Sequence, residues 1–286
     1  MARKKSITIV GPGNVASVLA PALRKARYRL DEIVSRDLPE SIKRAKSLAK
    51  KTQALASTLA DCRLDADVIW ICSTDDVIAK VARALATRRN VDWRSKIVLH
   101  ASSAVTSDEL KALKKQGAAV ASTHFMQSFA PGSNPTLKVP FSVEGDKKAR
   151  EAALEIGNAL GASTLVLPKR NRVLYHAIGA FSSPMVIASL SVAEELARVT
   201  GLSSEQTRAV IGPIFSRTAE NFLRKGSTAA FGGPISRGNV ATLRNYLQAL
   251  KRTPEARSAF LALGKAAVKR LPVKNRKELD KLFAKG

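Results

Sequence analysis

Short apolar runs alternate with amphipathic helical patterns through the first 168 residues of the chain. The runs that predict strands cover residues 6–10, 30–34, 67–72, 96–100, 118–122, 141–145 and 163–167. The patterns that predict helices lie between them, at about residues 13–27, 39–51, 77–85, 107–116 and 147–160. Strands and helices that alternate at this spacing form right-handed βαβ units, so we predict a mostly parallel sheet covered by helices.

The pattern changes at Pro168. No further strand signal follows, and long helical patterns cover about residues 169–200, 204–225, 239–251 and 254–270. A chain of 286 residues is long enough for two domains, each with a core of its own. We therefore predict an α/β domain at residues 1–168, followed by an all-helical domain at residues 169–286.

A glycine-rich turn joins the first predicted strand to the first predicted helix. Gly11 and Gly13 lie two positions apart, and Ala16 follows three positions later. With this spacing the first glycine makes a tight turn, the second lets backbone N–H groups approach a pyrophosphate, and the small third residue keeps the helix close to the strand. The helix start at Asn14 and Val15 adds free N–H groups and its dipole. This turn predicts a Rossmann domain that binds a dinucleotide, with a glycine turn in another parallel α/β protein as the alternative.

In such domains, residues at the end of the second strand contact the adenosine ribose of the cofactor. This chain has Ser35 and Arg36 there. An acidic residue would bind the ribose hydroxyls of NAD and repel a 2′-phosphate, whereas arginine pairs with that phosphate through a planar fork of donors. We therefore predict NADP as cofactor, with NAD as the alternative if Asp37 reaches the ribose. Ser73 and Thr74 follow the third predicted strand, and we expect them to contact the same cofactor.

The three histidines all lie at motif-like positions. His100 and His124 end predicted strands, and His176 lies near the start of the helical half. The carboxyl ends of parallel strands line the ligand crevice, so His100 and His124 are expected to point towards it. A structural role is the alternative for each histidine. They are far apart in the sequence, with no second ligand at close spacing, so we predict no metal site.

An arginine follows a flexible turn in the second half of the chain. Arg237 stands just before a predicted helix, after the residues Gly232-Gly233-Pro234. An arginine in such a place suits a carboxylate or phosphate of a bound ligand. The alternative is a plain helix start in which Asn239 is the N-cap.

The chain carries a formal net charge of +25, spread along its whole length. Such a charge favours association with polyanions. Most of the charges fall on predicted helix faces, and no nucleic-acid-binding motif accompanies them. A solvated basic surface is therefore favoured over specific nucleic-acid binding.

The features that report on cellular location point to a cytoplasmic protein. Cys62 and Cys72 are too few for a disulfide framework, and we expect Cys72 to be a small buried thiol. The basic start of the chain leads to no long apolar run of a signal peptide. No window reaches the 18 or so apolar residues of a spanning helix, so we expect no membrane segment.

Taken together, these motifs resemble those of a known family. The residues that carry the resemblance span nearly the whole chain: Gly11 to Ala16, Ser35-Arg36, His100 to Ser103, His124 to Phe129, Tyr175-His176-Ala177, Phe181 to Ser183 and Gly233 to Gly238. The family consists of Rossmann-like proteins whose helical second domain is of the 6-phosphogluconate-dehydrogenase type and has long been described as a domain of unknown function. Some members are assigned as alternative ketopantoate reductases. Pyrroline-5-carboxylate reductase and the β-hydroxyacid dehydrogenases are more distant relatives.

The chain departs from the family's pattern at several positions. Ser102-Ser103 stands where the family has Ser-Gly, and His124-Phe125 stands where it has His-Pro. Pro184 replaces an asparagine, and Asn239 replaces an aspartate. In the dehydrogenase relatives, a lysine followed four residues later by asparagine supplies the acid. Aligned on Pro184, the lysine position is Ala180, so the resemblance carries over fold and cofactor better than catalysis.

The resemblance implies an NADP-dependent oxidoreductase that transfers hydride to the carbonyl or imine of a small carboxylated substrate, such as a 2-dehydropantoate-like acid. It implies that Ser102 and His124 lie near the reactive face of the nicotinamide and that Arg237 holds the substrate anion. His176 becomes the leading proton donor, because an imidazole titrates near neutral pH. The resemblance also implies a homodimer built through the helical domain.

Two other functions remain open from the sequence. The first is a nucleotide-binding sensor or regulatory protein without turnover, which the departures from the family's catalytic positions favour. The second is a polyanion-binding protein, which only the net charge favours.

Overall fold

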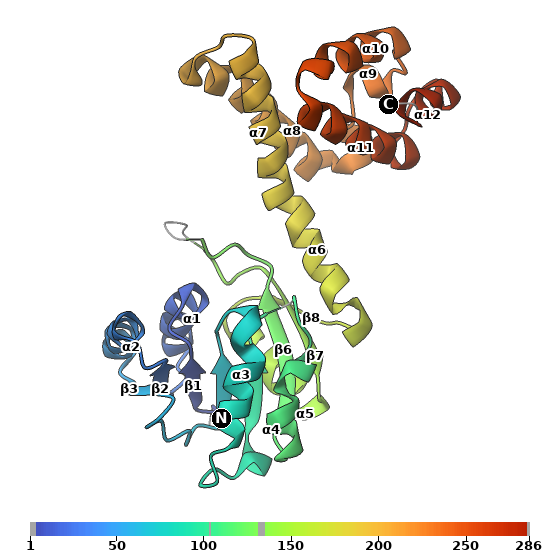
Figure 1. The fold of residues 1–286 in the computed structure, drawn as a ribbon. Helices are drawn as coiled ribbons and strands as arrows, with labels where there is room; N and C mark the ends of the chain where they lie inside the picture. Colours follow the sequence, from blue (N-terminus) through green and yellow to red (C-terminus); the bar gives the residue numbers. More distant parts are fainter. Residues whose placement is uncertain (1–3, 103, 131–134, 285–286) are drawn as a thin grey trace. The chain divides into compact units, whose positions relative to one another are not determined.

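The computed structural model describes residues 4–102, 104–130 and 135–284 (Figure 1). The chain divides into two compact units, Met1–Ala180 and Phe181–Gly286. The division lies within a helix, further along the chain than the boundary predicted near Pro168. The start of this helix counts with the first unit because its first residue, Arg172, is buried there.

The first unit contains a single eight-stranded sheet among its described residues. Its strands are β1 (Ile7–Val10), β2 (Leu30–Ser35), β3 (Leu55–Thr58), β4 (Val68–Ile71), β5 (Ile97–His100), β6 (Ala119–Phe125), β7 (Pro140–Gly145) and β8 (Ser163–Val166). They lie in the order β3-β2-β1-β4-β5-β6-β7-β8, and every neighbouring pair is parallel except β6 and β7. The predicted mostly parallel sheet is confirmed. Only β3 was missed, because this short edge strand is largely exposed and has no apolar run.

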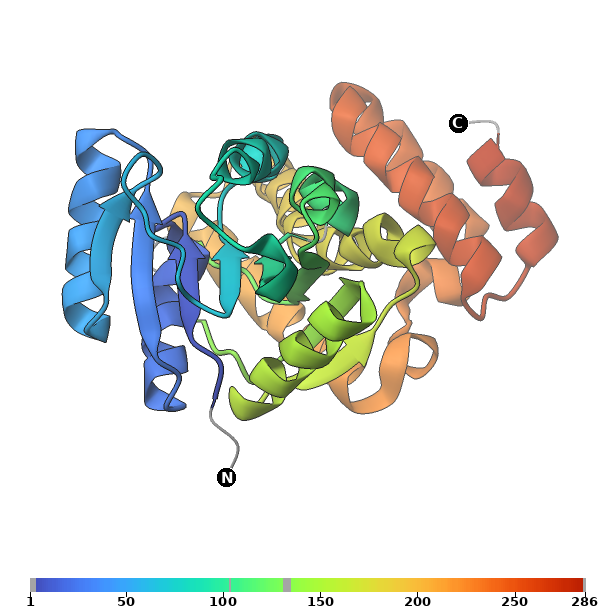
Figure 2. The same ribbon diagram turned by 90° about the horizontal axis from the view of Figure 1, so that it is seen from below.

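Helices cover both faces of the sheet (Figure 2). They are α1 (Asn14–Lys25), α2 (Pro39–Thr52), α3 (Asp75–Ala86), α4 (Lys111–Lys115) and α5 (Lys147–Ala159). The 3₁₀ turns η1 (Trp93–Ser95), η2 (Ser107–Leu110) and η3 (Lys169–Asn171) lie between the regular elements, and helix α6 (Arg172–Ser182) follows η3. Helices α1, α2 and α5 pack on one face, where Ile9 and Trp70 are buried. Helices α3 and α4 pack on the other, where Val10 and Ile69 are buried. Alternate strand residues therefore enter opposite cores, as a sheet buried on both faces requires.

The second unit is helical throughout its described residues. Its elements are α7 (Pro184–Val199), α8 (Ser204–Ala230), α9 (Gly233–Ser236), α10 (Val240–Ala249), η4 (Leu250–Arg252), α11 (Pro254–Arg270) and α12 (Arg276–Ala284). The predicted end of the second long helix, at residue 225, falls beside Gly226, whose backbone is not helical. Helix α12 was missed because its polar sequence offers few apolar positions. Two of them, Leu279 and Phe283, complete the core of this unit against α10 and α11.

One helical stretch, Lys169–Val199, is long and apolar enough to cross a membrane, judged by length and composition alone. Its most apolar window has a mean hydropathy of 1.5, and none of that window is buried. The expectation of no membrane segment stays a prediction, although the search behind it passed over this stretch. It counted unbroken apolar runs, whereas this segment mixes aliphatic residues with alanine and serine. The stretch is not one continuous α-helix, since α6 ends at Ser182 and α7 begins at Pro184.

Candidate functional site

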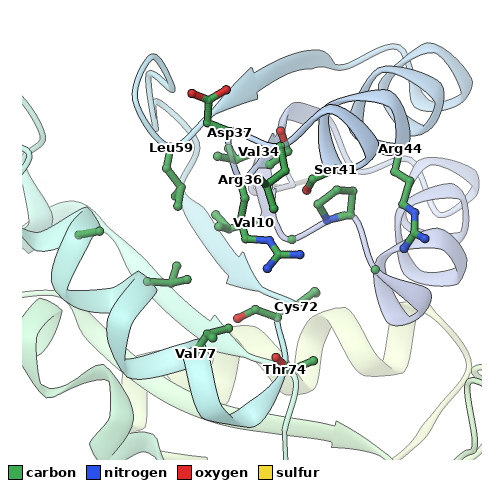
Figure 3. A pocket seen from close by; sticks show the side chains of 18 of the residues that line it. Val10, Val34, Arg36, Asp37, Ser41, Arg44, Leu59, Cys72, Thr74 and Val77 are labelled. Carbon is green, nitrogen blue, oxygen red and sulfur yellow. The ribbon is translucent and has the colours of Figure 1, made fainter.

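A cavity of about 710 Å³ opens at the carboxyl ends of β1, β2 and β4 (Figure 3). The chain runs outward from β1 through β2 to β3 and then returns to β4 on the other side of β1. Ligands of open parallel sheets bind at such a reversal of strand order, outside the carboxyl ends of the strands. The cavity is lined by the turns after these three strands and by the facing sides of α2 and α3.

The glycine turn forms one wall of the cavity. Gly11 has φ +102°, and a Cβ atom built on it would lie 3.0 Å from the carbonyl carbon and oxygen of Cys72. Only glycine fits this close crossing of two backbone segments. Gly13 has φ −87° and lies against open space, with Cys72 O at 3.7 Å as the nearest atom that its Cβ would meet. Packing within the protein therefore explains why residue 11 must be glycine. At residue 13, the missing side chain leaves open the space that a ligand would fill.

Helix α1 begins at this turn with exposed donor groups. Gly13 is its N-cap and provides no side-chain cap, and no acidic residue occupies the first turn. An uncapped helix N-terminus next to a cavity attracts an anion through its N–H groups and its dipole. Asn14 and Val15, predicted to contact the cofactor, form that first turn but are not among the residues that line the cavity.

The end of β2 distinguishes the two predicted ribose contacts. The Arg36 side chain extends into the cavity, while the carboxylate of Asp37 points away from it (Figure 3). Ser35 is buried, and its Oγ donates to the Ser57 carbonyl at 3.3 Å. The side chain of Ser35 is therefore used within the sheet, and Arg36 presents a planar cation to whatever occupies this end of the cavity.

Two residues that the sequence reasoning missed lie on the same side of the cavity. Ser41 and Arg44 line it from α2, where a spacing of three places them on one face of the helix. The sequence places both residues in the helix that follows this strand, but it does not show which face of that helix turns to the cavity. With Arg36, Arg44 gives this end of the cavity two guanidinium groups, and Ser41 adds a hydroxyl.

Ser73 and Thr74 lie where the sequence places them, in the turn after β4. The Oγ of Ser73 is buried and has no hydrogen-bond partner among the described residues. Such an orphaned hydroxyl is costly unless a ligand or water pairs with it. Cys72, beside it, is buried as expected, and burial raises the pKa of its thiol to about 12. Cys72 is thus a packing residue of the cavity wall and no nucleophile.

These observations fit a dinucleotide. The uncapped start of α1 suits a pyrophosphate, the orphaned Ser73 hydroxyl lies beside it in the lining, and the guanidinium groups of Arg36 and Arg44 suit a further phosphate.

Two of the predicted catalytic residues meet in the first unit. His124, near the end of β6, and His176, in α6, lie edge to face with ring centroids 5.7 Å apart and an interplanar angle of 86°. Both are half-buried. Burial lowers the pKa of His124 to about 4, and the positive charges of Arg172 and His176 act in the same direction. At neutral pH His124 is therefore uncharged beside His176.

A buried arginine that the sequence reasoning missed lies next to this pair. Arg172 is fully buried, and its Nη1 donates to Ser142 Oγ at 2.7 Å while its Nη2 donates to the Ser102 carbonyl at 3.1 Å. Burial lowers the pKa of the guanidinium to about 10, so it stays charged at neutral pH. The basic run before α6 hid this residue, because nothing in the sequence separates Arg172 from its exposed neighbour Arg170.

Ser102 and His100 hold the loop after β5. The Ser102 backbone N–H donates to Nδ1 of His100 at 3.2 Å, and Nε2 of His100 lies 3.1 Å from the Thr106 carbonyl. Because Nδ1 accepts, Nε2 carries the proton. Burial lowers the pKa of His100 to about 4. The structural role, left open for His100, is what this geometry supports. Ser102 Oγ accepts from the Ala104 N–H at 3.1 Å, and Ser103 lies outside the described residues.

Arg237 lies in the second unit and is exposed at the end of α9. The side chain of Asn239 accepts a hydrogen bond from the Thr242 N–H at 3.3 Å, so Asn239 is the N-cap of α10, as the alternative interpretation of this turn has it. His176 and Arg237 belong to different units, and their action on one ligand stays a prediction.

The fold and the cavity define a class of protein, a Rossmann-type α/β unit followed by a helical unit, as predicted. The family comparison identifies the second part: residues 139–267 match the family described as "Domain of unknown function (DUF2520)". This match confirms the resemblance drawn from the sequence motifs. No curated protein matches the chain by sequence.

Solved structures of similar fold cover nearly the whole chain. A candidate NADP oxidoreductase from Bacteroides fragilis is 21% identical over 93% of this chain and 99% of its own, with a TM-score of 0.74. A protein from Thermotoga maritima is 19% identical over 96% of this chain and 98% of its own, with a TM-score of 0.72. An imine reductase from Myxococcus stipitatus in complex with NADP⁺ is 16% identical over 98% of this chain and 99% of its own, with a TM-score of 0.70. At these identities the likeness is one of fold.

Proposed function

We propose that the protein is an NADP-dependent oxidoreductase that transfers hydride to the carbonyl or imine carbon of a small carboxylated substrate. The observation that carries the proposal is the ribose end of the cavity, where Arg36 points inward and Asp37 points away (Figure 3). A guanidinium group pairs with the 2′-phosphate that distinguishes NADP from NAD. The NADP⁺ bound to the imine reductase of similar fold supports the same cofactor.

The phosphate groups of the cofactor each have residues that would hold them. The turn at Gly11 and the start of α1 would hold the pyrophosphate, with the Ser73 hydroxyl beside it. Arg36 and Arg44 would share the 2′-phosphate. When bound, NADPH supplies the hydride, and the protein has to orient the substrate and supply a proton.

The histidine pair supplies that proton in our proposal. His176 donates it to the carbonyl oxygen or imine nitrogen as the hydride arrives, and His124 stays neutral beside it. Arg237 holds the substrate carboxylate through its fork of donors. A 2-dehydropantoate-like acid suits this scheme, because it has a ketone and a carboxylate, and a cyclic imine acid suits it equally.

We also propose that the protein is a cytoplasmic homodimer assembled through its helical part. The segment from α6 to α8 exposes large apolar side chains, with Phe181 at 72% and Leu223 at 82% of full exposure. Apolar surface of this kind needs a cover. A second copy of the chain provides one without a membrane, and it would account for the apolar stretch Lys169–Val199.

Two measurements on the purified protein test the proposal. Calorimetric titration should show NADPH binding at least about tenfold more tightly than NADH, a difference of about 1.4 kcal/mol. NADPH oxidation should then be followed against a panel of 2-keto acids and cyclic imines. His176→Ala should lower turnover at saturating substrate with little change in NADPH affinity. Arg237→Lys should mainly weaken substrate binding, whereas Arg244→Lys, at an exposed arginine of the same unit, serves as the control.

A second function, an NADP-binding sensor without turnover, is favoured by Ala180, Pro184 and Asn239. These residues stand where the family resemblance places catalytic lysine, asparagine and aspartate. Tight NADPH binding without oxidation by any member of the panel would favour the sensor. Equal affinities for NADPH and NADH would contradict both versions of the cofactor assignment.

A further inference from the structure

The contacts of Arg172 go beyond what holding a helix in place requires. Its guanidinium joins α6 to β7 through Ser142 and to the loop after β5 through the Ser102 carbonyl. Glu144, whose charge acts on Arg172, is itself engaged by the N–H and hydroxyl of Ser107. In the described part of the chain, no acidic side chain hydrogen-bonds to Arg172, and its Nε has no partner. A buried charge held only by neutral groups is a costly arrangement, which suggests a role other than stability.

The position of Arg172 on α6 connects it to the histidine pair. Arg172 and His176 are four residues apart and therefore share one face of the helix. The Ser142 hydroxyl also donates a hydrogen bond to the His124 carbonyl, at 3.5 Å. Ser142 thus links Arg172 of α6 to the strand that carries His124, and this contact holds the first turn of α6 in place.

We propose that Arg172 is a positioning residue for the histidine pair: it fixes the first turn of α6 against β7 and the loop after β5, and so holds His176 edge-on to His124. The proposal rests on the proposed function, in which His176 donates a proton. The contact itself is measured without any substrate, so the two ideas can fail separately.

The charge of Arg172 has a second effect on the same pair. Burial is the main cause that lowers the pKa of His124, and Arg172 and His176 are the charged groups that act on it. Arg172 is in turn faced by Glu144 and Tyr175. A neutral His124 cannot be the group that loses a proton during turnover at neutral pH. His176 is therefore the proton donor of the pair in this proposal, since burial, reinforced by the charge of Arg172, keeps His124 neutral.

The test uses nuclear magnetic resonance titration of the three histidines in the full chain without cofactor. His124→Asn identifies the His124 signal. In the parent protein, ring contacts between His124 and His176 should be seen, and His124 should not titrate above about pH 5. Arg172→Met should raise its titration midpoint by at least about half a pH unit and weaken the ring contacts. Arg172→Lys keeps the charge but loses the two-armed contact, so it should keep the midpoint and weaken the contacts. Arg170→Met, at the exposed arginine of the preceding turn, should change neither.

Turnover gives the second readout. Arg172→Met should lower kcat at least about tenfold and shift its pH profile, with NADPH affinity unchanged within about twofold. If Arg172→Met does not fold, Ser142→Ala removes one of the two acceptors and should weaken the ring contacts in the same way. A parent-like His124 midpoint together with parent-like ring contacts in the folded variants would overturn the proposal, even if their melting temperature fell. If the parent protein turns over no substrate, the proposed function fails, and the titration and ring contacts still decide the role of Arg172.

Discussion

Replacing each glycine of the turn by alanine should separate folding from cofactor binding. At Gly11, a Cβ atom would lie 3.0 Å from the carbonyl carbon and oxygen of Cys72 and 3.1 Å from the Ser73 nitrogen, at a φ of +102°. All three atoms are backbone, so two strand ends must move apart to admit the methyl group. At Gly13, the same methyl group meets only Cys72 O, at an ordinary 3.7 Å, and φ is negative.

The two substitutions should therefore differ in stability. Gly11→Ala adds an unfavourable backbone conformation and overpacking, each of which costs about 1–3 kcal/mol. The sum of about 2–6 kcal/mol corresponds to a fall in Tm of roughly 4–24 °C for a unit of this size. Gly13→Ala should change the free energy of unfolding by less than about 1 kcal/mol, because its backbone conformation is open to alanine. Thermal unfolding followed by circular dichroism measures both.

The effect on cofactor binding should not follow the effect on stability, because Gly13→Ala is expected to weaken binding in a stable protein. Gly13→Ala fills the space in front of α1 that a pyrophosphate would occupy, so calorimetry should show NADPH affinity at least about tenfold weaker in a protein of parent-like stability. A Gly13→Ala variant that binds NADPH as the parent does would refute the assignment of this turn to the cofactor. A Gly11→Ala variant as stable as the parent would refute the packing argument.

Three further predictions concern the cofactor, the pH dependence and the assembly. Arg36→Ala should reduce the preference for NADPH over NADH at least about fivefold, while Asp37→Ala should leave it unchanged, both measured by calorimetry. Burial lowers the pKa of His100 in the folded protein to about 4, from its ordinary value of 6.5. Between pH 4 and 6.5 the unfolded state therefore binds one proton more than the folded state. Stability should thus fall as the pH drops from about 6.5 to 4, by up to about 3 kcal/mol from His100. His100→Asn should flatten this fall in urea titrations, and an unchanged fall in the variant would contradict the assignment to His100. Phe181→Glu, at 72% exposure, should convert the expected dimer to a monomer in light scattering, and a parent protein that is already monomeric at micromolar concentration would contradict the dimer.

The regular pattern of the first unit is what made its fold predictable. Runs such as residues 67–72 are buried on both faces, and their composition alone marks them as strands. Residues Leu55–Thr58 lack this mark because an edge strand needs neither face fully covered. The turn at Gly11 was predictable for a similar reason, since a local backbone requirement leaves a direct trace in the sequence.

The candidate site was less predictable where it depends on distant contacts. His124 and His176 could be singled out one by one, but the sequence does not show that their rings meet. Arg172 is hidden among basic neighbours, and only the burial of its side chain distinguishes it. Arg44 required knowledge of which face of α2 turns to the cavity. Tertiary contacts of this kind are set by packing between elements, on which local spacing carries no information.

The buried guanidinium of Arg172 also limits how freely the two halves of this chain could have been exchanged during evolution. The polar interior beside β7 is completed by a residue of the helix that leads out of the α/β unit. A recombination event at Pro168, where the sequence pattern changes, would remove the guanidinium that donates to the Ser142 hydroxyl and would leave the Ser102 carbonyl with only the Ser122 hydroxyl as donor. A transferable α/β module must therefore include the opening turns of α6, and the modular border of this protein lies inside a helix.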